Sequence, residues 1–123
     1  MIYLISGDDE TKHGAWRSRL RRRAEESNGP GALEAFDAAT SGPEVVAAAL
    51  AAMTLGGDER YIVVDGVESW KAGALDPLER ALAEPLDDTI LLLLARGRAP
   101  QRLLKAVAAA GGEQREYEAP KAW

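Results

Sequence analysis

Cysteine is absent from this chain of 123 residues, and histidine occurs only once, as His13. Without cysteine the chain has no disulfide, no thiolate metal site and no cysteine nucleophile, which favours a reducing cytoplasm as its location. A single histidine excludes a multi-histidine metal centre and leaves one candidate base for a Ser-His-Asp triad. We therefore expect no catalytic residue, no metal and no cofactor.

Long apolar runs and an excess of positive charge are missing as well. No apolar run approaches the ~20 residues of a membrane-spanning helix, and the run at residues 90–95 has the length of a strand. The chain begins directly with a strand-like segment and shows no basic and then apolar signal region. The formal net charge of −5 argues against indiscriminate binding to DNA or to a membrane.

The apolar residues that are present predict one α/β domain. Strand-like and helix-like patterns alternate along the chain, and this alternation is typical of a three-layer fold, a five-stranded parallel sheet flanked by helices. The three most apolar strands are expected inside the sheet and the two alternating ones at its edges. Asp8 or Asp9 is expected to cap the first helix, and Thr40 or Ser41 the second. The expected strands are residues 2–5, 33–37, 61–66, 89–95 and 113–118, and the expected helices are residues 11–27, 41–53, 75–83 and 100–110.

The stretch that follows the first strand has the position of a phosphate-binding loop but not its residues. The Walker pattern requires a glycine, four residues, and then Gly-Lys-Ser/Thr, so that backbone N–H groups and a lysine surround the phosphates. Counted from Gly7, those last three places hold Lys12, His13 and Gly14. Three acidic residues would also repel a polyphosphate. The residues of this degenerate loop are Gly7, Asp8, Asp9, Glu10 and Lys12.

The third strand ends in Asp65, the position of a Walker B aspartate, but Gly66 stands where the glutamate that activates water would be. We interpret Asp65 as a turn residue at the end of a strand. The sequence thus predicts a degenerate nucleotide-binding architecture that has lost its nucleotide.

The first helix carries a cluster of arginines, residues 17–23, and these permit two interpretations. Several guanidinium groups within three turns are typical of a patch for nucleic acid or for an acidic partner. Arg19 and Arg22 also lie at helical contact spacing from Glu26, which is typical of a solvated helix face. We favour the solvated face.

Three stretches, residues 3–10, 55–64 and 117–121, together resemble one family. It is the delta subunit of the bacterial DNA polymerase III clamp loader, and the resemblance is to its amino-terminal domain. The resemblance implies that residues 1–119 form an AAA+-like domain I that does not bind nucleotide. It also implies that residues 120–123 begin a linker to a lid domain and a collar.

The resemblance further implies a function in DNA replication. The chain is expected to be a non-catalytic part of the polymerase holoenzyme that binds the sliding clamp (beta) and helps to open it for loading on primed DNA. Delta prime and the tau or gamma subunits would be contacted through other parts of the protein, and DNA only within the assembled complex. The clamp-binding residues carried over from the family are Met53, Thr54, Leu55 and Gly56, with Gly56 standing where many relatives have an aromatic residue.

A receiver domain of a signalling relay is one alternative, because it has a similar length and the same alternation of elements. Its acidic pair would be Asp8 and Asp9, its phosphoacceptor Asp65, and its lysine Lys121. Lys121 follows Pro120, however, whereas receivers have the lysine before the proline.

An atypical nucleotide hydrolase is the other alternative. It would have to use Lys12 as its phosphate-binding lysine, one place early, and Gly14 would offer no hydroxyl group to magnesium.

Overall fold

The computed structural model describes residues 1–52 and 59–119 of the chain. Every expected strand and helix is present within two residues of its expected bounds, because the apolar runs and the glycine and proline breaks of the sequence mark them. The elements are β1 (Ile2–Gly7), α1 (Glu10–Asn28), β2 (Leu33–Asp37), α2 (Pro43–Ala51), β3 (Arg60–Asp65), the short 3₁₀ helices η1 (Val67–Ser69) and η2 (Ala72–Ala74), α3 (Asp76–Ala83), β4 (Thr89–Arg96), α4 (Gln101–Ala109) and β5 (Glu113–Glu116).

The five strands form one parallel sheet in the order β2-β3-β4-β1-β5. The alternating strands β2 and β5 lie at the edges and the apolar strands lie inside, as their sequences predict. This order differs from the order 2-1-3-4-5 of the doubly wound fold that receiver domains share. The receiver alternative is therefore wrong for this chain.

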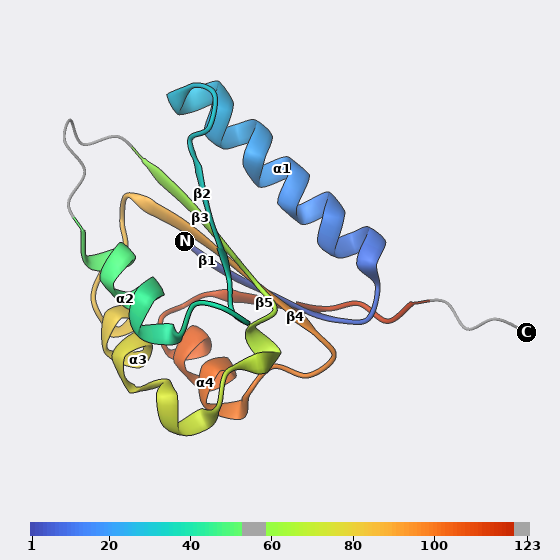
Figure 1. The fold of residues 1–123 in the computed structure, drawn as a ribbon, viewed down its shortest axis with the longest axis vertical. Coiled ribbons are helices and arrows are strands. Elements are labelled where there is room, and N and C mark those ends of the chain that lie inside the picture. Colours follow the sequence, from blue (N-terminus) through green and yellow to red (C-terminus); the bar gives the residue numbers. More distant parts are fainter. Residues whose placement is uncertain (53–58, 120–123) are drawn as a thin grey trace, which may run out of the picture.

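The helices lie on both faces of the sheet (Figure 1). On one face α2, α3 and α4 cover the larger part of the core, which includes Leu4, Val64 and Leu93. On the other face α1 packs its Leu20 and Ala24 on a smaller cluster of strand residues. No helix within residues 1–52 and 59–119 has the length and apolar content to cross a membrane.

The caps of the first two helices differ in how well the sequence predicts them. Asp9 caps α1, since its Oδ1 accepts from the N–H groups of Thr11 and Lys12 at 3.1 and 3.3 Å. The prediction for α2 is wrong, because Gly42 is its N-cap residue and makes no side-chain cap. Thr40 and Ser41 instead donate their N–H groups to the Asp37 carbonyl and form the turn after β2.

Candidate functional site

The connection between β1 and α1 is too short to surround a phosphate group. Strand β1 ends at Gly7 and α1 begins at Glu10, so only Asp8 and Asp9 lie between them. A Walker loop needs a longer stretch of free backbone N–H groups than this. Here the side chain of Asp9 already accepts from the N–H groups of Thr11 and Lys12. The residues after Asp9, which a Walker loop would need, belong to α1.

The backbone of residues 117–119 lies against this short turn. Asp9 donates its N–H to the Tyr117 carbonyl at 3.4 Å, and Tyr117 donates its own N–H to the Ser6 carbonyl at 2.9 Å. The N–H of Ala119 donates to Asp8 Oδ1 at 2.6 Å. The chain's own backbone therefore lies against the end of β1, beside the turn where a nucleotide-binding domain has its phosphates.

Gly7 is required at the turn for two reasons. Its φ of +105° belongs to the region that favours glycine. A Cβ atom added there would also lie 1.9 Å from the carbonyl oxygen of Tyr117, far inside van der Waals contact. In a phosphate loop a glycine allows the backbone to approach a ligand, whereas here it allows the backbone to approach residue 117.

His13 lies in α1 with its side chain fully buried. Its Nε2 lies 3.0 Å from the Gly7 carbonyl oxygen. A carbonyl can only accept, so Nε2 carries the proton and donates it. Nδ1 has no hydrogen-bond partner among the described residues. The imidazole is thus buried against the end of β1, on the helix that a Walker lysine would occupy.

Lys12 is exposed on α1, and its ammonium group lies 5.5 Å from the centre of the Tyr117 ring. Such a separation is typical of a cation–π contact. The side chain is therefore engaged with the segment that covers the turn. None of the three residues at the Walker places 12–14 is arranged as a phosphate ligand.

A cluster of ion pairs occupies the carboxyl edge of the sheet, where ligands of open α/β sheets bind. Arg96, at the end of β4, lies 2.8 Å from Asp65 Oδ1 at the end of β3 and also pairs with Glu10 at the start of α1. Arg17 places its Nη2 3.3 Å from Asp65 Oδ2. The backbone N–H of Arg96 donates to Glu68 Oε1 at 2.9 Å. We call Glu10, Arg17, Asp65 and Arg96 the edge cluster.

The edge cluster neutralises its own charges. The hydrogen bond from Arg96 lowers the pKa of the Glu10 carboxyl group below its ordinary value. The bonds to Glu10 and Asp65 in turn raise the pKa of the Arg96 guanidinium. Asp65, the Walker B candidate, is therefore engaged by two guanidinium groups, which would have to move before its carboxylate held a magnesium ion. Within residues 1–52 and 59–119 no three acidic or histidine side chains gather in a way that would hold a metal.

Sequence reasoning missed Arg96, and it interpreted Asp65 as a turn residue or, in the receiver alternative, as a phosphoacceptor. One signal was available, since Arg96 is the first charged residue after the seven residues of the most buried strand. A charge at the carboxyl end of a central strand lies at the functional edge of a parallel sheet, next to the ends of its neighbours.

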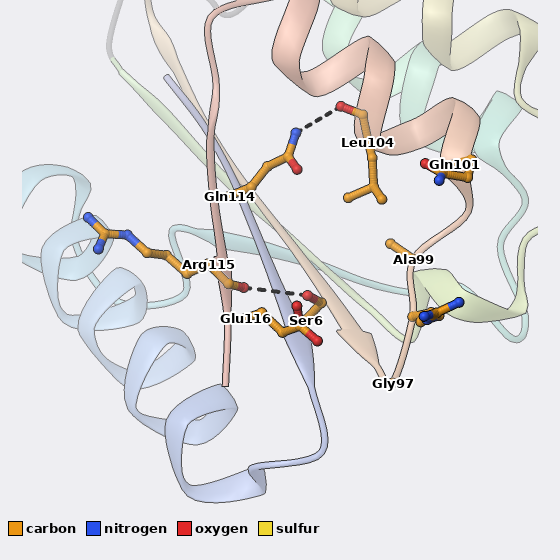
Figure 2. A pocket seen from close by; sticks show the side chains of 9 residues that line it. Ser6, Gly97, Ala99, Gln101, Leu104, Gln114, Arg115 and Glu116 are labelled. Atoms are coloured by element: carbon orange, nitrogen blue, oxygen red, sulfur yellow. Dashed lines mark hydrogen bonds between the residues drawn. The ribbon is translucent and has the colours of Figure 1, made fainter. Parts of the chain in front are cut away.

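A polar pocket of about 440 Å³ lies beside the carboxyl end of β1, on the face that carries α4 (Figure 2). In it Gln114 Nε2 donates to the Leu104 carbonyl at 2.8 Å, and Ser6 Oγ donates to the Arg115 carbonyl at 3.5 Å. These bonds join β5 to α4 and to β1, which gives the polar lining a structural role. The pocket is lined by Ser6, Gly97, Arg98, Ala99, Gln101, Leu104, Gln114, Arg115 and Glu116.

The clamp-binding residues expected from the sequence, Met53, Thr54, Leu55 and Gly56, lie outside the described residues. The structure does describe both sides of that segment. Arg60, the first residue of β3, donates from Nη1 to the carbonyls of Ala49 and Ala52 at the end of α2, the latter at 2.9 Å. Its Nη2 lies 2.7 Å from Glu34 Oε1 on β2.

Arg60 therefore joins the residues that precede and follow the segment 53–58. Its side chain is only 11% exposed, and its guanidinium satisfies carbonyl groups that the end of a helix leaves without partners. Ala52 and Arg60, which flank the segment, are consequently held close to each other at the amino-terminal end of β3.

Comparison with known proteins gives one informative result. The sequence matches no protein-family model and no curated protein. Among solved structures, the fold is similar to the Bacillus subtilis DNA clamp loader delta protein (YqeN), with a TM-score of 0.72 and 19% sequence identity. The likeness covers 98% of this chain and 39% of the other, so the chain spans about two fifths of that protein's length. The five-stranded α/β fold of this chain is therefore one that occurs in a DNA clamp loader delta protein.

Proposed function

We propose that this chain is the domain of a clamp loader delta subunit that binds the sliding clamp and helps to open it for loading on primed DNA. The observation that carries the proposal is the likeness of 98% of the chain to a DNA clamp loader delta protein. The resemblance of the stretches 3–10, 55–64 and 117–121 to the same family, noted from the sequence, is in keeping with it.

The turn between β1 and α1 supports a role without nucleotide. The two-residue connection, the backbone of residues 117–119 against it and the buried His13 leave little room for phosphates. We propose that the domain is AAA+-like, has no ATPase activity of its own, and serves as a non-catalytic part of a polymerase holoenzyme in the bacterial cytoplasm. ATP would act through partner subunits of the delta prime and tau or gamma type, which other parts of the protein would contact.

The clamp contact itself is proposed for residues 53–56, with Leu55 as the anchor. An apolar side chain that enters a partner's pocket commonly dominates an interface, and burial of a leucine contributes about 2 kcal/mol. The bonds of Arg60 to the end of α2 support this assignment, since they hold both sides of the segment in place.

Surface plasmon resonance with the sliding clamp of the same organism tests the proposal. The Leu55→Asp variant should lose at least roughly thirtyfold in affinity, the equivalent of the leucine's burial. Val45→Asp is the matched control, because Val45 is 40% exposed in the first turn of α2, where a negative charge is favourable. The control should bind normally.

Two results would contradict the proposal in different ways. Absence of binding by the unaltered chain would contradict the clamp-binding function. Equal binding by the unaltered chain and by Leu55→Asp would contradict the assignment of residues 53–56 as the site but would still support the clamp-binding function.

A further inference from the structure

On one face of the sheet, α1 is the covering helix among the described residues (Figure 1). A groove is lined by side chains of α1 and of the neighbouring strands. Its floor is formed by Ile90 and Leu92 of β4, and one wall is formed by the rings of Tyr3 and Trp16. Arg19 and Arg23 border it from α1. The volume of the groove is about 340 Å³, and its lining is more apolar than that of the pocket of about 440 Å³.

The aromatic rings of the groove form a small platform. The centres of Tyr3 and Trp16 lie 5.3 Å apart with an angle of 48° between the ring planes. The guanidinium of Arg19 lies 5.7 Å from the centre of the Trp16 ring. Both residues are partly exposed, so the aromatic pair lies at the surface beside a positive charge.

The charge of α1 is opposite to that of the rest of the chain. Residues 12–23 contain six cationic side chains and no acidic one, whereas the other residues contain nine cationic and twenty acidic ones. Arg19 and Arg23 form no ion pair with any described residue, and the expected pairing of Arg19 with Glu26 is not observed. The groove's acidic residue, Glu113, faces Arg115 at 3.5 Å. An anionic occupant would therefore meet uncompensated guanidinium groups.

We propose that this groove binds single-stranded nucleic acid, with Arg19 and Arg23 on the phosphates and a base stacked on the rings of Tyr3 and Trp16. Aromatic rings interleaved with arginines are the usual way in which proteins hold single strands. A duplex keeps its bases stacked on each other and would use only the charge. An acidic peptide would also use only the charge, since carboxylates have no ring face. The proposal stands on α1 and its groove and does not depend on the clamp-binding function.

Fluorescence anisotropy with a labelled oligo(dT) of about twelve nucleotides tests the proposal on the 123-residue chain. Replacing both groove arginines, as Arg19→Ala with Arg23→Ala, should weaken binding at least about tenfold and reduce the salt dependence by about two phosphate contacts. The matched control, Arg21→Ala with Arg22→Ala, removes the same charge from the same helix outside the groove. It should change the affinity less than about threefold.

The contribution of the rings is tested separately. Trp16→Ala should weaken binding about tenfold and Trp16→Phe much less, since phenylalanine keeps a stacking face. Circular dichroism of both variants verifies that α1 is intact. If a variant fails to fold, Tyr3→Ala replaces it, and the same loss of affinity is expected.

Competitors distinguish the possible occupants. Unlabelled oligo(dT) should displace the probe. Weaker competition by oligo(U) would indicate a site for DNA, and equal competition would indicate a site that also accepts RNA. Either of these two results supports the proposal. It is overturned if the chain does not bind oligo(dT) at low salt, if a duplex or poly-glutamate competes as well as oligo(dT), or if both arginine pairs lower the affinity equally.

Discussion

The guanidinium of Arg60 donates to the carbonyl oxygen of Ala52 at 2.9 Å, so that the first residue of β3 holds the end of α2. The same side chain pairs with Glu34 on β2, which brings three elements together at one buried cation. The side chain does more than place a charge at the surface, because its removal takes hydrogen bonds from the Ala49 and Ala52 carbonyls and from the Glu34 carboxylate.

We predict that Arg60→Ala lowers the free energy of unfolding by about 1.5–3 kcal/mol, the usual range for hydrogen bonds to a charged group. Urea denaturation followed by circular dichroism measures the change. Arg22→Ala is the control, since Arg22 is exposed and forms no ion pair with the described residues. It should stay within about 0.5 kcal/mol of the unaltered chain. Equal stability of both variants would show that Arg60 has no structural role.

The close approach of Gly7 to Tyr117 leads to a second prediction. Gly7→Ala should destabilise the chain by more than about 2 kcal/mol, because the new Cβ meets the Tyr117 carbonyl and the backbone has positive φ. Gly14→Ala is a matched substitution on α1, where a Cβ would have no neighbour within 4 Å. Alanine is favoured over glycine inside a helix, so this variant should gain about 0.5–1 kcal/mol. Thermal unfolding of the pair should give shifts of opposite sign.

Nucleotide should not stabilise the domain. A ligand that binds only the folded state increases the free energy of unfolding, by about 2.7 kcal/mol when its concentration is a hundred times its Kd. The unfolding temperature rises accordingly. With the β1–α1 turn covered by residues 117–119, we expect no shift with ATP and magnesium in differential scanning fluorimetry. A concentration-dependent rise would favour the alternative of an atypical hydrolase that uses Lys12.

The pairing of Glu10 with Arg96 predicts a dependence of stability on pH. The hydrogen bond from Arg96 lowers the pKa of Glu10 in the folded state from its ordinary value of 4.5. A lowered pKa means that the contribution is fully present above 4.5 and is lost as the pH falls through the folded-state value. Glu10→Gln should therefore be less stable than the unaltered chain at neutral pH, and the difference should shrink at lower pH. Urea midpoints measured at both pH values test this, and a difference independent of pH would contradict it.

Much of the fold was predictable because local patterns and tertiary structure agree. The apolar runs at residues 2–5 and 89–95 become inner strands, the alternating residues 33–37 become an edge strand, and Asp9 caps α1 as its position suggests. The prediction of Thr40 or Ser41 as the cap of α2 was wrong because both residues belong to the turn after β2, where they donate to the Asp37 carbonyl. The local sequence does not show which of the two roles these residues have.

The site was less predictable, because its contacts join distant parts of the chain. Arg96 and Glu10 are 86 residues apart, and only the parallel sheet and the position of α1 bring them together. The burial of His13 likewise depends on how α1 packs against the end of β1, where the Nε2 of His13 meets the Gly7 carbonyl oxygen. The assignment of Leu55 stays a prediction, since residues 53–58 lie outside the described part.

The edge cluster also bears on the mechanics of the domain. Nucleotide-hydrolysing domains open and close around their ligand, whereas salt bridges here tie the start of α1 to the ends of β3 and β4. The segment 53–58 leads into the opposite end of the same sheet. Because these salt bridges connect the elements at the carboxyl end of the sheet, we expect the sheet to move as a rigid body. A force on its amino-terminal end should then displace the carboxyl end as well. If the chain opens a ring as proposed above, it needs that stiffness.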